Sequence, residues 1–164
     1  MCLNKNKLTK RKSKKILDLI SKWVSGLFDD DDVPERLFNM LIKYKNNFPK
    51  ECLFNGTVYR KTNNINLESD PKNNIIYRMR SCSINKGDNH KNLYNHFVGK
   101  YYQFTCEDGF ILEKISKYLC DLLKKGYDEI PYYGIFGYSP IERMIEESEV
   151  ICIVSKKDLK REKL

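Results

Sequence analysis

The stretch that decides the fold is SPIERMIEESEVICIV, residues 139–154. Its first half has serine, proline and glutamate in the order of a helix-capping box with proline in the first turn, which predicts a short helix to about Glu146. Its second half, EVICIV at residues 149–154, is almost wholly apolar, as in a strand covered on both faces. A helix that leads directly into a central strand indicates a fold of mixed helix and strand.

Outward from this stretch, the middle of the chain continues the mixed pattern. Residues 109–125 carry leucine and isoleucine at helical spacing and are stopped by Gly126. Short runs of β-branched and aromatic residues between turn-forming residues predict three strands, and a further short helix is expected at 89–98. The three strands span residues 57–62, 75–83 and 101–105.

The first 50 residues are helical in pattern. Apolar side chains recur at helical spacing from residue 10 to 28, and Gly26 with the acidic run 29–32 ends that helix. The same aspartates and Pro34 suit the first turn of a second helix, which Pro49 closes. We therefore expect an α+β protein, with an N-terminal helical hairpin followed by a mixed or antiparallel β core.

The formal net charge of +8, from 30 basic and 22 acidic residues, is concentrated at the two ends. Residues 1–15 hold seven basic and no acidic side chains, and residues 156–164 hold five basic and two acidic ones. This divides the chain into a basic N-terminal tail (1–15), a helical extension (16–50), an α+β domain (51–155) and a basic C-terminal tail (156–164). Such tails either solubilise a protein or attract an acidic or nucleic-acid-containing partner.

Several classes are disfavoured by the composition. No run of about 18 apolar residues occurs, so no membrane span or membrane partner is expected, and the basic start lacks the apolar stretch of a secretory signal. We therefore expect a cytoplasmic protein. The six scattered cysteines form no CxxC pair, which predicts free, buried thiols and no metal site. The absence of alanine is typical of an AT-rich coding sequence, such as that of a phage. If a phage encodes the chain, the expected compartment is the cytoplasm of its host.

Three polar features accompany the expected strands in a fixed order. Arg60 lies inside an early strand, Ser81 and Ser83 end the next, and Glu147 and Glu149 enter the hydrophobic one. Period-two alternation is expected to put Glu147 and Glu149 on one face of that strand. Paired carboxylates beside an apolar strand are costly unless they face a cleft or have partners, which indicates a site.

With these motifs in this order, the sequence resembles the mono-ADP-ribosyltransferases of the Arg-Ser-Glu type, including small phage and bacterial-toxin members. Their pattern is an arginine in the first strand, a Ser-Thr-Ser motif at the second, and a Glu-x-Glu motif followed by a hydrophobic strand. The resemblance covers residues 54–155, with Cys82 in place of the middle threonine. It implies the fold of that family for the β core and NAD as a substrate.

The resemblance also implies roles for the motif residues. Arg60 would clamp the NAD pyrophosphate, because a guanidinium offers two parallel donors to phosphate oxygens, and Ser81 and Ser83 would complete the NAD-binding set. Glu149 would stabilise the oxocarbenium-like transition state, while Glu147 would orient or deprotonate the acceptor. The resemblance therefore implies a phage or bacterial effector that modifies a partner protein, with arginine favoured as the acceptor.

The loop before the last helix lies where that family keeps its substrate-recognition turn, which assigns this role to Phe136 and Tyr138. Two other functions stay open on the sequence. One is a non-enzymatic, phage-type protein that binds or inhibits a protein or nucleic-acid complex through its helices and basic ends. The other is a relative that keeps the fold and uses the site for binding alone. The histidines, His90 and His96, have no spacing that supports a Cys–His nucleophile.

Overall fold

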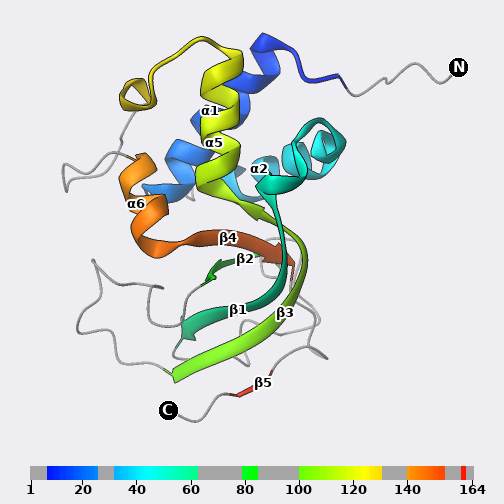
Figure 1. Cartoon of the computed structure of the whole chain (residues 1–164), viewed down its shortest axis with the longest axis vertical. Helices are drawn as coiled ribbons and strands as arrows, with labels where there is room; N and C mark the ends of the chain where they lie inside the picture. Colours follow the sequence, from blue (N-terminus) through cyan, green and yellow to red (C-terminus); the bar gives the residue numbers. More distant parts are fainter. Residues whose placement is uncertain are drawn as a thin grey trace, which may run out of the picture.

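The computed structural model describes residues 7–25, 32–62, 79–84, 100–130, 140–153 and 160–161, which form a helical layer beside an antiparallel sheet (Figure 1). This confirms the mixed α+β class. The helices are α1 (Lys10–Val24), α2 (Val33–Lys43), α5 (Leu112–Leu122) and α6 (Pro140–Glu147), and the 3-10 turns are η2 (Lys45–Asn47), η3 (Lys50–Cys52) and η4 (Tyr127–Glu129). The strands are β1 (Leu53–Thr62), β2 (Met79–Ser83), β3 (Lys100–Ile111), β4 (Glu149–Ile153) and β5 (Lys160–Arg161).

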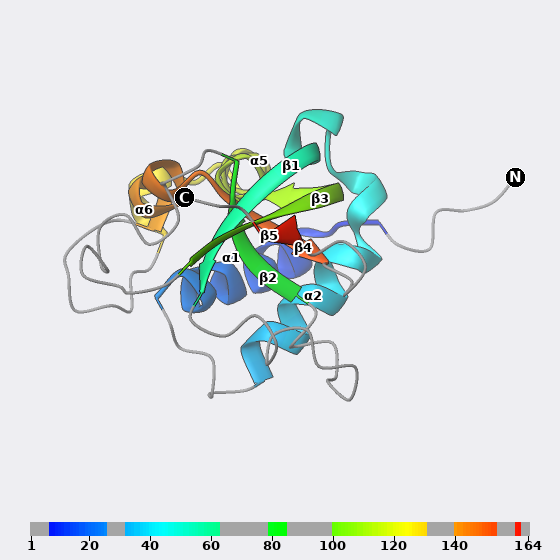
Figure 2. The ribbon, with the colours of Figure 1, turned by 90° about the horizontal axis from the view of Figure 1, so that it is seen from below.

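The strands are ordered β1-β2-β4-β3-β5, and β1 also pairs with β3, so the first four close into a ring of antiparallel pairings (Figure 2). Strand β4 lies between β2 and β3, as expected for a central strand. Alternation along β4 divides its side chains between two cores. Val150 and Cys152 belong to a small cluster with Val58, Cys82 and Cys106, whereas Ile151 belongs to the larger core that the helices build.

The helical layer forms because each of its helices has one apolar face. The fully buried side chains of the larger core come mainly from α1, α2 and α5, and each adds about 1.5–3 kcal/mol by leaving water. They include Ile16, Ile20, Leu37, Leu41, Ile115 and Leu119. None of the described helices has the length and apolar character that crossing a bilayer requires.

Helix α1 begins at Lys10, inside the segment 1–15 that the charge pattern assigned to a tail. The Thr9 side chain caps the helix by accepting a hydrogen bond from the Lys12 amide at 3.2 Å, and Ser13 is already buried. The charge boundary therefore does not mark the structural one, because cations occupy the exposed face of a helix that is amphipathic from its first turn.

Two further boundaries differ from expectation. The helix expected over 109–125 begins only at Leu112, because Gly109 and Phe110 still pair with β1. The expected C-terminal tail contributes β5, whose residues pair with Tyr102 and Gln103 of β3. Both the start of α5 and the presence of β5 are decided by pairing with a neighbouring strand and not by local sequence pattern. The helix expected at 89–98 lies outside the described residues.

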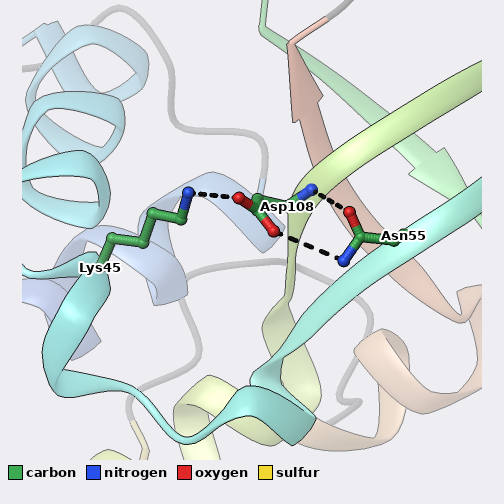
Figure 3. A network of polar contacts seen from close by, with 3 residues as sticks. All are labelled: Lys45, Asn55 and Asp108. Carbon is green, nitrogen blue, oxygen red and sulfur yellow. Dashed lines mark hydrogen bonds and ion pairs between the residues drawn. The ribbon is translucent and has the colours of Figure 1, made fainter.

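A polar cluster joins the helical layer to the sheet (Figure 3). Lys45 of η2 contacts the carboxylate of Asp108 at 2.5 Å, and the Asp108 amide donates to the Asn55 side chain at 2.9 Å. Asp108 has a positive φ of 50°, and Asn55 stands at the register shift between Phe54 and Gly56 in β1. The hydrogen bond from Lys45 lowers the pKa of Asp108. Since both groups are well exposed, the cluster fixes geometry more than it adds stability.

Candidate active site

The strand register brings two of the three polar motifs together. Ser83, the last residue of β2, pairs with Glu149, the first residue of β4, and on its other side with Tyr59 of β1. Residues that pair directly across an antiparallel sheet lie on the same face, so Tyr59, Ser83 and Glu149 form one row across three strands. The serine motif and the second glutamate of the Glu-x-Glu motif are therefore neighbours.

The arginine motif lies next to this row but not in it, because alternation along β1 puts neighbouring residues on opposite faces. Arg60 follows Tyr59 in β1 and pairs with Tyr102 of β3, while Ser81 pairs with Ile151 of β4. For Arg60 and Ser81 the structure describes the backbone alone. Phe136, Tyr138, His90 and His96 lie outside the described residues altogether.

Glu147 and Glu149 do not share a strand, so the expectation that alternation places them on one face is wrong. Glu147 is the last residue of α6 and Glu149 is the first of β4. Ser148 between them has a φ of 46° and donates its amide to the carbonyl of Ile145 at 3.1 Å, which ends the helix. Period-two alternation does not apply across a left-handed turn.

The Ser148 turn positions Glu149. The left-handed region disfavours residues with a Cβ, so the surrounding structure has to hold Ser148 there. Its carbonyl accepts a hydrogen bond from the amide of Ile84 at 3.1 Å, which ties the turn to the end of β2. The chain therefore reverses from α6 into β4 at the point where Glu149 comes beside Ser83.

We expect Ser148→Val to lower the free energy of unfolding by about 1–2 kcal/mol, because a β-branched side chain clashes with its own backbone at positive φ. Ser148→Gly, which removes the side chain without strain, is the matched control and should stay close to the wild type. Urea unfolding of the three proteins measures the difference. A valine variant as stable as the glycine variant would contradict the left-handed assignment.

Both described side chains of the site are buried. Ser83 is 0% exposed and Glu149 is 5% exposed. The Glu149 Oε1 atom accepts a hydrogen bond from the indole Nε1 of Trp23 at 3.0 Å. Trp23 is in the last turn of α1, so the N-terminal helix contributes directly to the surroundings of the carboxylate. Trp23 falls within the apolar spacing of residues 10–28, which does not indicate this contact, and the one polar atom of its ring is the signal that could have done so.

The opposite face of the sheet holds thiols. Cys82, the middle residue of the serine motif, belongs to the small core with Cys106 and Cys152, and the sulfur atoms of the latter two are 2.7 Å apart. Hydrogen bonding with Cys106 and Cys82, together with burial, raises the pKa of Cys152, so its thiol stays protonated at neutral pH. The five described cysteines are free and buried, as expected. Within the described ranges no group of three His, Cys, Asp or Glu side chains could hold a metal ion.

Comparison of the chain with family models, with curated proteins and with solved structures gives no match. The features that bear on function are the row of Ser83 and Glu149, the indole that binds the carboxylate, and the neighbouring motif residues.

Proposed function

We propose that the chain transfers ADP-ribose from NAD to a protein side chain, with arginine as the favoured acceptor. The observation that supports this most is the register Tyr59–Ser83–Glu149. It brings the serine motif and the carboxylate motif, far apart in the sequence, to one row across β1, β2 and β4. Arg60 is the next residue of β1, one position off this row, so its part in the proposal rests on the family resemblance and not on the register.

In the proposed reaction, the bond between C1′ of the ribose and the nicotinamide nitrogen breaks, and nicotinamide leaves with the electron pair. The ribose ring then carries positive charge, which a fixed carboxylate stabilises better than water does. An acceptor nitrogen forms the new bond to C1′ and releases one proton. Glu149 supplies the fixed negative charge, and its low exposure strengthens that effect because little water screens it.

The remaining motif residues have roles that follow from their chemistry and from the family resemblance. The Ser83 hydroxyl, paired across the sheet with Glu149, suits a ribose hydroxyl or the carboxylate itself as its partner. Arg60 would bind the pyrophosphate of NAD. Ser81 would be a further residue that binds NAD. Glu147 precedes the turn that leads to Glu149, and there it would accept the proton that the acceptor releases.

The test is incubation of the purified chain with NAD labelled in the adenylate part, using poly-arginine and poly-lysine as acceptors. We expect label on poly-arginine and release of free nicotinamide in equal amounts. Free nicotinamide without labelled acceptor would mean hydrolysis of NAD, which would remove the transferase part of the proposal. If protein that unfolds cooperatively, and is therefore folded, yields neither labelled acceptor nor free nicotinamide, the proposal that the chain is an enzyme acting on NAD is refuted.

One observation favours a second function, binding of an acidic partner. The first two turns of α1 expose Lys10, Arg11, Lys14 and Lys15, and no acidic residue stands in the first turn. These cations lie at the end of the helix where its dipole is already positive, so a nearby anion stabilises the arrangement. A protein acceptor with an acidic surface, or a nucleic-acid complex, fits this charge.

Reversal of the four charges, by exchanging Lys10, Arg11, Lys14 and Lys15 for glutamate, is expected to weaken binding to an anionic partner such as duplex DNA or heparin. The affinity should fall at least about tenfold at low salt, and its dependence on salt should become less steep. Substitution is preferable to deletion, because removing residues 1–15 would remove the Thr9 cap and the buried Ser13.

The matched control for this charge reversal has four glutamates at other exposed lysines, namely Lys43, Lys50, Lys114 and Lys124. Both variants have the same net charge, so a difference between them reports the location of the charges. Equal affinity and equal salt dependence of the two variants would show that α1 is not the binding surface.

A further inference from the structure

Trp23 is the only tryptophan of the chain, and it lies where α1 meets the candidate site. The residue is 8% exposed and belongs to the larger apolar core. Its one polar atom, the indole nitrogen, is used for the hydrogen bond to Glu149 across 126 positions of sequence. An apolar ring with its donor aimed at a carboxylate combines packing with a directed polar contact.

The surroundings hold the indole in place. Helix α1 packs against α2, α5 and α6, and its buried residues Ile16 and Ile20 fix its rotation about its own axis. At the C-terminal end of the helix, the amide of Ser25 donates to the carbonyl of Ser21 at 3.0 Å, so the last turn is closed directly after Trp23. The donor therefore comes from a rigid element.

Glu149 gains orientation from this contact. It follows the left-handed Ser148 and begins β4, so its backbone is set by the turn and by pairing with Ser83. A carboxylate in low-dielectric surroundings requires hydrogen-bond donors, and each carboxylate oxygen accepts up to two of them. The indole thus fixes one oxygen of the Glu149 side chain.

We propose that Trp23 is a positioning residue for Glu149, so that helix α1 is a working part of the active site and not an appendage to it. This inference rests on the proposed function. Loss of the indole donor would leave the carboxyl group present, but no longer held in one orientation. Misplacement of a reacting group lowers the turnover number more than it changes substrate binding.

The sharpest test replaces Trp23 by β-(3-benzothienyl)alanine, in which sulfur takes the place of the indole N–H and the ring keeps its shape. We expect kcat for nicotinamide release to fall by about 10–100-fold, with the KM for NAD within about twofold of the wild type. Trp23→Phe should behave in the same way but with some loss of stability. Ile115→Val, a small cavity in the same core but on α5, is the control that should lower stability and leave kcat unchanged.

A second measurement does not depend on turnover. The chain has a single indole, so its side-chain ¹H–¹⁵N resonance is one assigned peak, and Glu149→Ala should move it far more than Glu51→Gln, which changes an exposed carboxylate. An unmoved peak, or a benzothienyl variant with wild-type kcat in an active enzyme, would overturn the positioning role alone. An inactive wild type would overturn the proposed function and this inference together.

Discussion

Replacement of Glu149 by glutamine is expected to slow ADP-ribose transfer by about 100–1000-fold while the binding of NAD is largely kept. Under the proposed function, the variant loses a negative charge that would face the positive ribose of the transition state, in surroundings where Glu149 is only 5% exposed. An amide keeps the shape of the side chain and an oxygen that accepts from the Trp23 indole. The variant therefore separates the charge of the carboxylate from its position.

Nicotinamide release under saturating NAD measures this effect, and the unfolding curve of the variant shows that it remains folded. Glu51→Gln is the control, because it removes an exposed carboxylate outside the site. Half or more of the wild-type rate in Glu149→Gln would refute the assignment of the transition-state role to this residue. The row Tyr59–Ser83–Glu149 would then be a structural feature only.

The largest expected effect on stability is that of Gly109→Ala. A Cβ at this position would stand 2.4 Å from the Cys106 sulfur and 2.7 Å from Cγ1 of Val150, both in the buried cluster inside the strand ring. Real Cβ atoms do not approach so closely, so the strands have to move apart. Overpacking of this kind costs about 1–3 kcal/mol, and the two close contacts place this case at the upper end.

Urea unfolding checks the value, with Gly126→Ala as the control. There the new Cβ would lie 2.6 Å from an oxygen of Asp128, but that atom is the end of an exposed side chain that can turn away. Its change should stay within about 0.5 kcal/mol. Cys106→Ala introduced together with Gly109→Ala should recover part of the loss, because it removes the closest atom. Equal stability of the Gly109 and Gly126 variants would contradict the tight ring.

The helical face of α1 and the central position of β4 could be predicted from sequence, because both depend on local pattern. Ile16 and Ile20 recur at helical spacing, and the run EVICIV is too apolar for an edge strand. The end of β3 could not. The residues from Gly109 to Ile111 fit a helix or a strand equally, and pairing with β1 and β4 decides between them.

The candidate site also has features that could be predicted from sequence and features that could not. The family resemblance implied that Ser83 and Glu149 belong to one site, and their pairing is a matter of register. The separation of Glu147 from Glu149 was not predictable, since the spacing rule assumes that both residues belong to one strand. The contact between Trp23 and Glu149 depends on how α1 packs against the sheet, and no local pattern encodes that packing.

The closed ring of strands has unequal junctions. Strands β1 and β3 pair from Leu53 to Thr62, whereas in the described residues β1 meets β2 at the pairing of Tyr59 with Ser83. A short ladder opens at a lower free-energy cost than a long one. Among the described residues, amide deuteration should consequently enter the strand ring at the β1–β2 seam before the β1–β3 seam, and under the proposed function this is the seam at which the row of Ser83 and Glu149 begins.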